Sequence, residues 1–216
     1  MASPLQVACV VEPNFGENAY VVWCRDGGPC WIMDPGLPPS AKQISKHVAQ
    51  HKLKPEGVLL THGHLDHIAG VPELLGEFAG LPVLIAKEEK QALVDPEENL
   101  SGDFGAPVVV GEIETRDLAA GSDLTLDDSN WRVLDTSGHS PGGRSLYCAA
   151  AGIVFVGDAL FQGSIGRTDF HHSDPDGLIR NIREKLFSLP DETEVYSGHG
   201  PVTTIGEEKR YNPFLR

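Results

Sequence analysis

The strongest constraint on the fold is where potential metal ligands fall relative to the apolar segments of the chain. Four short apolar segments each run directly into such a residue, in the stretches Thr61-His62-Gly63-His64, Thr136-Ser137-Gly138-His139, Gly157-Asp158 and Ser197-Gly198-His199. Short apolar segments with turn-rich flanks are typical of β-strands. Loops on a rigid sheet are where binding sites are usually built. The sequence therefore predicts a sheet structure whose strand ends deliver side chains to one site.

Strand and helix patterns alternate along the chain. The predicted strands cover residues 19–23, 30–33, 57–60, 83–86, 131–134, 146–149, 153–156 and 195–196. Apolar residues at three- and four-residue spacing predict helices over 40–51, 71–78, 88–94 and 178–189. This alternation favours a layered α/β fold. A length of 216 residues suits one large core, so we expect a single domain over 1–216.

Charge and cysteine usage exclude several classes of function. A formal charge of -14, from 17 basic and 31 acidic residues, repels nucleic acid and anionic membrane surfaces. No apolar run is long enough to cross a bilayer, and residues 1–16 lack the pattern of a signal peptide. The four cysteines are irregularly spaced and form no C-x-x-C pair. We therefore expect a cytoplasmic protein with free thiols and without nucleic-acid or membrane partners.

The densest group of ligands is the pattern H-x-H-x-D-H, formed by His62, His64, Asp66 and His67. An extended backbone places the first two histidines on one side. We expect the other two residues to turn inward where a following helix starts near Ile68. Imidazole nitrogens and carboxylate oxygens suit zinc, iron or manganese, whereas a structural zinc site would be richer in thiolates.

The remaining candidates are meaningful only as a group. Alone, His139 or His199 would be read as an ordinary hydrogen-bonded histidine, and Asp158 as a turn residue. Together the candidates number seven, which exceeds the four ligands of a single structural zinc ion. The sequence thus predicts a site for two divalent cations. The predicted ligands are His62, His64, Asp66, His67, His139, Asp158 and His199.

In order and spacing, these residues resemble the metallo-β-lactamase superfamily over nearly the whole chain. The resemblance implies an αββα sandwich. It also implies that His62, His64 and His139 hold one metal, that Asp66, His67 and His199 hold the second, and that Asp158 bridges the two.

Shorter motifs look like a single-domain glyoxalase II-like hydrolase within that superfamily. They are Asn18-Ala19-Tyr20, Asp34-Pro35-Gly36, Gly166-Arg167-Thr168-Asp169, Gly198-His199-Gly200-Pro201 and Asn212-Pro213-Phe214-Leu215. The resemblance implies hydrolysis of S-lactoylglutathione or a related hydroxyacyl thioester. Two cations that share a water lower its pKa from about 16 towards 7, and the resulting hydroxide attacks the carbonyl. Asp66 would orient this nucleophile, and Arg167 would bind the anionic glutathione portion.

Several alternatives stay open at this point. Arg167 is equally well read as a surface or structural arginine, and Asp34 either orients a ligand histidine or serves as a turn residue before Pro35. His171 and His172 are predicted to be solvated loop residues. Full-length glyoxalase II adds a C-terminal helical domain, which leaves other thioesters or esters as alternative substrates.

Two other functional classes compete with thioester hydrolysis. Residues 166–170 also resemble a persulfide dioxygenase, which uses a single iron ion. A metal-stabilised binding protein without turnover is the third hypothesis, and it would require blocked coordination positions. β-Lactam, lactone and phosphodiester hydrolysis also occur on this fold, and the acidic charge makes a nuclease the least attractive of these.

Overall fold

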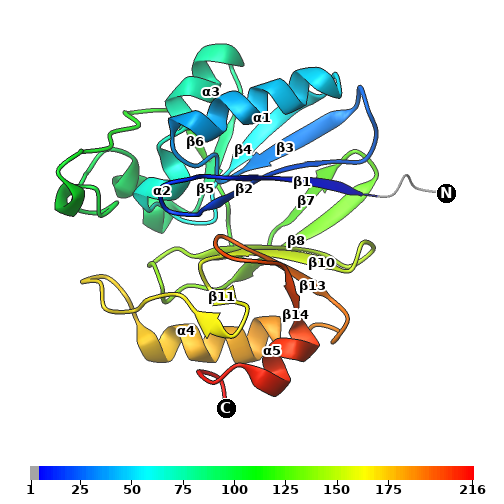
Figure 1. Cartoon of the computed structure of the whole chain (residues 1–216), viewed down its shortest axis with the longest axis vertical. Coiled ribbons are helices and arrows are strands. Elements are labelled where there is room, and N and C mark those ends of the chain that lie inside the picture. Colours follow the sequence, from blue (N-terminus) through cyan, green and yellow to red (C-terminus); the bar gives the residue numbers. More distant parts are fainter. Residues whose placement is uncertain (1–4) are drawn as a thin grey trace.

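The computed structural model describes residues 5–216, and over this range the chain folds into two facing β-sheets with helices on both outer faces. Figure 1 shows α1 (Pro38–Gln50) and α3 (Val71–Glu77) above the first sheet, and α4 (Pro175–Asn181) and α5 (Ile205–Tyr211) below the second. This arrangement is the predicted αββα sandwich. Within the described range, no helix combines the length and apolar character needed to cross a lipid bilayer.

The first sheet comes from the N-terminal half of the chain. Its strands, in spatial order, are β1 (Gln6–Val11), β2 (Asn18–Trp23), β3 (Pro29–Met33), β4 (Lys54–Leu59), β5 (Val83–Ile85) and β6 (Thr115–Asp117). The strands from β3 to β6 are parallel, so their carboxyl ends meet at one edge. That edge carries the H-x-H-x-D-H segment.

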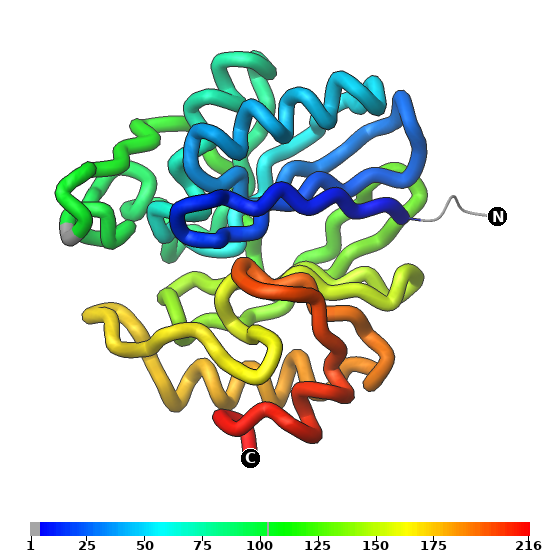
Figure 2. The backbone as a smooth tube through the Cα atoms, in the orientation of Figure 1, coloured from blue at the N-terminus to red at the C-terminus, as the bar shows by residue number. Residues whose placement is uncertain are grey.

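The second sheet comes from the C-terminal half. Its spatial order is β14 (Thr203–Thr204), β13 (Glu194–Ser197), β10 (Ile153–Gly157), β9 (Arg144–Cys148), β8 (Ser129–Asp135) and β7 (Asp123–Leu126). A small ribbon of β11 (Leu160–Phe161) and β12 (Ser164–Ile165) follows β10. Figure 2 shows the two halves of the chain stacked with little interchange between them.

Strand residues alternate between two apolar layers because successive side chains point to opposite faces of a sheet. In β3, Ile32 packs under the helices of the first half, while Trp31 packs between the sheets. In β10, Phe155 faces the first sheet and Val156 faces α4 and α5. Both faces of β3 and β10 are buried, because the other sheet covers one face and helices cover the opposite face.

Most predicted elements are present, but three helices differ from the prediction. The helix expected near Ile68 already begins at Leu65 in α2 (Leu65–Ile68), so that Asp66 and His67 lie inside it. The helix predicted over 88–94 is a 3-10 helix, η1 (Lys87–Leu93), and a further one is η2 (Gly102–Phe104). The helix predicted over 178–189 continues from α4 as a π-helix, η3 (Ile182–Leu186).

Candidate metal centre

The seven predicted ligands come together at one edge of the sandwich, between the two sheets. Four come from the segment after β4 in the first sheet, and the other three follow β8, β10 and β13 in the second. We call the set of His62, His64, Asp66, His67, His139, Asp158 and His199 the ligand cluster. Its members are buried or half-buried, as a metal-binding cluster on a folded scaffold should be.

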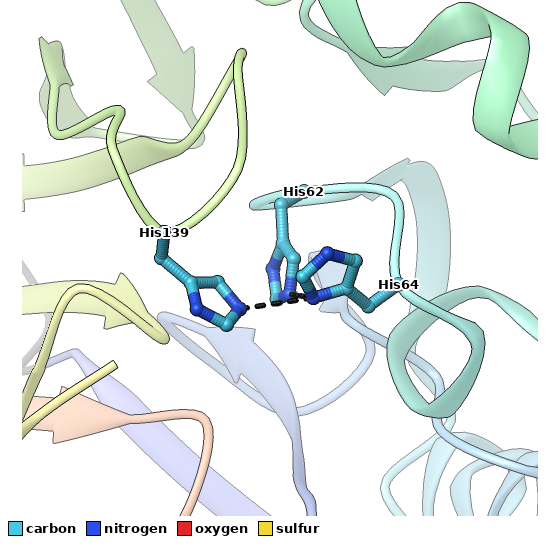
Figure 3. Close-up of side chains that lie close together, drawn as sticks. All are labelled: His62, His64 and His139. Carbon is cyan, nitrogen blue, oxygen red and sulfur yellow. Dashed lines mark hydrogen bonds between the residues drawn. The ribbon is translucent and has the colours of Figure 1, made fainter. Parts of the chain in front are cut away.

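One side of the ligand cluster consists of imidazoles only. His64 Nδ1 lies 3.1 Å from His62 Nε2 and 2.9 Å from His139 Nε2, so the three rings converge on one point. Figure 3 shows their nitrogens pointing toward one another from two separate segments of the chain. Burial, followed by neighbouring imidazoles, lowers the pKa of both His62 and His64 well below the ordinary value. These two rings are therefore neutral, which is the form that binds a metal ion.

The other side of the ligand cluster mixes imidazoles and carboxylates. His199 Nε2 lies 3.3 Å from Asp66 Oδ2, and His67 Nε2 lies 3.9 Å from the same oxygen. Burial on its own would lower the pKa of His67. The negative charges of the Asp158 and Asp66 carboxylates outweigh burial and raise this pKa well above the ordinary value. The same competition raises the pKa of His199 to about 9. This half of the cluster stabilises positive charge.

Asp158 stands between the two sides. Its Oδ1 lies 3.4 Å from His67 Nε2, and its Oδ2 lies 3.6 Å from His139 Nε2 and 3.5 Å from His199 Nε2. Burial opposes ionisation of Asp158, yet the adjacent His67 and His199 hold the pKa of its carboxyl well below the ordinary value. Within the described residues, Asp158 Oδ1 and His67 Nε2 are buried without a hydrogen-bond partner. Such atoms fit a site for a cation, which would pair with both.

Parallel pairing of β3 with β4 explains the position of Asp34, which directly follows β3. Its Oδ1 accepts a hydrogen bond from the Thr61 backbone N–H at 2.8 Å, and its Oδ2 accepts one from the Thr61 hydroxyl at 2.6 Å. The same Oδ2 lies 3.1 Å from His67 Nδ1, on the far side of the ring from Asp158. The structure therefore favours the interpretation that Asp34 orients a histidine of the cluster.

Parallel pairing of β10 with β13 likewise brings Asp158 and His199 to the same edge. Gly198 donates its backbone N–H to the Gly157 carbonyl at 2.8 Å. A Cβ atom at Gly198 would lie 2.2 Å from Asp158 Oδ1, so no larger residue fits there without moving the carboxylate. His139 is fixed from outside the cluster, because its Nδ1 lies 2.7 Å from the Arg167 carbonyl oxygen.

Sequence reasoning missed two buried glutamates near the cluster. Glu89 accepts hydrogen bonds from the backbone N–H of Gly63 at 3.0 Å and of Gly142 at 2.6 Å, and so ties together the two loops that carry His62, His64 and His139. Glu17 is fully buried, and burial raises its pKa well above the ordinary value. No local pattern marks either residue, because both gain their environment only from tertiary packing.

The ligand cluster opens into a cavity of about 280 Å³. Six of the residues that line this cavity outside the ligand cluster are Phe15, Leu100, Phe104, Phe161, Arg167 and Phe170. We call these six residues the mouth. The Arg167 guanidinium lies 4.8 Å from the centre of the Phe170 ring and donates to both carboxylate oxygens of Asp169, at 2.9 and 2.8 Å. The aromatic residues of the mouth were not predicted, since single exposed aromatics carry no recognisable spacing.

His172 is the predicted loop residue whose environment differs from expectation. It is half-buried, and its Nε2 lies 3.2 Å from His64 Nε2. His171 is exposed, as predicted.

The fold and this clustering of donors are those of a metallohydrolase scaffold, and comparison with known proteins gives the family. The chain belongs to the metallo-beta-lactamase superfamily, whose family model matches residues 13–199. The match ends at His199, the last member of the ligand cluster. Membership in this superfamily supports a metal-dependent hydrolase.

Relatives of similar length carry both general and specific names. The chain is 37% identical over 98% of its length to the hydroxyacylglutathione hydrolase GloC of Haemophilus influenzae, and it covers 98% of that protein. It is also 37% identical to the probable metallo-hydrolase YqgX of Bacillus subtilis, with 92% of each chain covered.

Solved structures show the same architecture. BLEG-1, described as a B3 metallo-beta-lactamase, is 37% identical and superimposes with a TM-score of 0.91 over 97% of this chain and 99% of that one. TTHA1623 in a di-iron-bound form is 34% identical, with a TM-score of 0.84 over 96% of this chain and 100% of that one. ETHE1 from Myxococcus xanthus is 27% identical, with a TM-score of 0.77 over 96% of this chain and 83% of that one.

Proposed function

We propose that this protein is a glyoxalase II-like thioesterase that hydrolyses S-lactoylglutathione or a related hydroxyacyl thioester with two divalent cations. The observation that carries the proposal is that six donors form two groups around a seventh, the Asp158 carboxylate, beside a cavity of about 280 Å³. The full-length similarity to a protein named hydroxyacylglutathione hydrolase supports the choice of substrate.

The distances support one assignment of the ligands. His62, His64 and His139 would hold the first cation, because their nitrogens converge within hydrogen-bond distance. The second cation would be held by Asp66, His67 and His199. Asp158 would bridge the two, since its oxygens face both groups. We propose zinc as the cation, because nitrogen and oxygen donors suit it. Iron is an alternative, since TTHA1623 is described in a di-iron-bound form, and manganese is a further one.

Two bound cations supply a water of lowered pKa and polarise the substrate carbonyl. The chain's own residues position the reactants around that chemistry. Asp66 lines the cavity, where its carboxylate can accept a hydrogen bond from the attacking water and orient it. A thiol of pKa about 8.5 leaves as a thiolate, so no strong acid is required from the protein.

The mouth suits a substrate with an apolar part and an anionic part. Phenylalanine and leucine side chains form most of its wall, and Arg167 contributes a guanidinium group at its edge. That group is exposed and already paired with Asp169, so an anionic substrate would exchange one carboxylate partner for another. Arg167 would therefore contribute to affinity for glutathione conjugates without taking part in bond cleavage.

β-Lactam hydrolysis is a second candidate because BLEG-1 combines 37% identity with a description as a B3 metallo-beta-lactamase. The chemistry is related, since both reactions add water to a carbonyl. In a β-lactam the leaving group is the ring nitrogen, which becomes an amine. This nitrogen is a poorer leaving group than a thiolate and gains more from a proton donor. The described lining of the cavity offers carboxylates, histidines, apolar groups and the Arg167 guanidinium, with no lysine among them.

A substrate panel with protein of known metal content tests these alternatives. We expect the highest kcat/KM for S-lactoylglutathione or another thioester, with about two metal ions per chain by elemental analysis. A higher kcat/KM for a β-lactam would contradict the proposal. Oxygen consumption with glutathione persulfide at one iron per chain would establish the dioxygenase alternative, and absence of turnover on the whole panel would favour a binding protein.

A further inference from the structure

A second group of donors lies outside the ligand cluster, at the edge of the mouth. Glu98, His171 and His172 each offer one donor atom, and these atoms lie within 4.8 Å of one another. His172 Nδ1 lies 3.2 Å from His171 Nε2, which in turn lies 4.0 Å from Glu98 Oε1. We call these three residues the rim triad.

The spacing of the rim triad is that of metal ligands. Donors about 2.1 Å from a tetrahedral zinc ion lie about 3.4 Å from one another, between the two distances above. Two imidazoles and one carboxylate form a donor set found in zinc and iron sites that leave further coordination positions open to water. The exposed Glu98 and His171 can adjust by rotation, so closing the longer distance requires no change in the backbone.

The rim triad joins two segments that are far apart in the sequence. Glu98 belongs to the loop after η1, and the two histidines belong to the loop after β12. Figure 2 shows these two loops, in green and in yellow, projecting from the same end of the molecule, one from each half. The first loop contributes Leu100 to the mouth and the second contributes Arg167 and Phe170. A cation on the rim triad would therefore hold together two walls of the substrate cavity.

We propose that Glu98, His171 and His172 form an auxiliary site for a divalent transition-metal cation that clamps the two loops across the mouth. This site is separate from the ligand cluster and does not depend on which reaction the cluster performs.

The rim triad and the ligand cluster differ in the number and burial of their donors. The rim triad has three donor residues, of which His171 is exposed and the other two are half-buried, whereas the ligand cluster has seven that are buried or half-buried. A site with fewer donors on a less rigid support binds a cation less tightly. The two groups meet where His172 Nε2 lies 3.2 Å from His64 Nε2. The auxiliary site is consequently weaker than the ligand cluster and fills last.

Metal counting in matched variants tests the proposal. The full chain is equilibrated with increasing free Zn²⁺, and bound zinc per chain is measured by equilibrium dialysis with elemental analysis. We expect the Glu98→Gln and His171→Ala variants to bind one zinc fewer than the wild type at high free zinc, and the same amount at low free zinc. The His171 side chain is 58% and the Glu98 side chain 42% exposed, and neither belongs to a hydrophobic core cluster, so we expect both variants to fold. His51→Ala is the control, because His51 also lies beside a carboxylate, Asp26, but does not line the cavity.

Hydrogen exchange gives a readout that zinc bound elsewhere on the surface would not produce. At a free zinc concentration about ten times the dissociation constant of the auxiliary site, exchange that requires separation of the loops slows by about tenfold. We expect this protection in both loops of the wild type and of His51→Ala, and in neither loop of the rim variants. Equal zinc binding by the wild type and both rim variants would overturn the proposal, as would an extra zinc that protects neither loop.

Discussion

The ligand cluster and the mouth lie within one cavity but are built in opposite ways. Every member of the cluster lies in a segment that follows a strand of a buried sheet. Asp34 and the Arg167 carbonyl contact two of its rings from outside, and Glu89 holds the backbone of two of the ligand loops. The mouth is formed by residues of loops and of two short elements, β11 and η2, and among them Phe15 is 37% and Phe104 is 60% exposed. The difference indicates that the chemistry is fixed by the scaffold, while the choice of substrate lies in parts that can change without disturbing it.

The largest expected effect comes from the carboxylate that joins the two sides of the cluster. We expect Asp158→Ala to reduce kcat/KM by about a thousandfold or more and to lower metal content below two ions per chain, because in our proposal both cations would lose a shared ligand. Activity assays and elemental analysis measure these effects. The surface variant Asp191→Ala serves as the control, since the Asp191 carboxylate pairs with Lys209 and Arg210, neither of which lines the cavity. Full activity with intact metal content in Asp158→Ala would contradict the assignment.

A smaller loss is expected from changing Asp34, which contacts His67 from outside the ligand cluster. Asp34→Asn keeps a side chain that tolerates the left-handed backbone conformation found here, with φ of 45°. The change removes the negative charge beside His67 Nδ1, and we expect metal affinity to fall by about 10- to 100-fold. Competition with a chelator measures this affinity. An unchanged affinity would mean that Asp34 acts only on the backbone of Thr61.

Glu89 tests how the scaffold holds the two ligand loops. Burial raises the pKa of its carboxyl above the ordinary value of 4.5, although hydrogen bonds from the backbone N–H groups of Gly142 and Gly63 oppose this rise. A raised pKa in the folded state means that the stabilising contribution is present below pH 4.5 and is lost as pH rises through the folded-state pKa. Glu89→Gln removes this titration.

The prediction for Glu89→Gln concerns the free energy of unfolding of metal-free protein. We expect the variant to be less stable than the wild type by about 1 to 3 kcal/mol below pH 4.5, because the amide nitrogen of glutamine cannot accept one of the two backbone hydrogen bonds, and we expect this deficit to shrink at higher pH. Denaturant titrations at several pH values measure this difference. A difference that stays constant with pH would show that the Glu89 carboxyl does not titrate differently in the folded and unfolded states.

The smallest effect is expected in the mouth. Arg167→Ala removes an exposed charge but keeps the backbone carbonyl that contacts His139, so metal content should stay intact. We expect KM for an anionic thioester to rise about three- to tenfold with kcat nearly unchanged, because exposed ion pairs contribute little. Asp169→Ala is the opposite test, since it frees the guanidinium and should lower this KM. An equal loss of kcat for anionic and neutral thioesters would place Arg167 in the catalytic machinery.

The sequence predicted what depends on local pattern. Buried strands such as β3 and β10 have an apolar signal that survives in any tertiary context, and the ligand-bearing stretches follow these strands directly. Local pattern also misled where the type of helix depends on packing. The apolar spacing over 88–94 predicted an α-helix, yet Glu89 turns inward from a 3-10 helix to hold two loops.

Features that require two distant segments could not be predicted. The role of Asp34 stayed open until the pairing of β3 with β4 placed it beside Thr61. The sequence predicts a solvated His172, because nothing in its neighbourhood in the sequence indicates that its loop packs against His64. The extent of a single domain over 1–216 and the identity of the metal stay predictions.

The division of the ligand cluster between the two halves has a consequence for assembly. On the proposed ligand assignment, the first half of the chain carries four donors within six residues and can capture a cation as soon as this segment is synthesised. Completion of both coordination shells must wait until the second half folds and docks. Metal loading is thereby coupled to the closure of the sandwich, and removal of the metal should loosen the contact between the sheets before it unfolds either sheet.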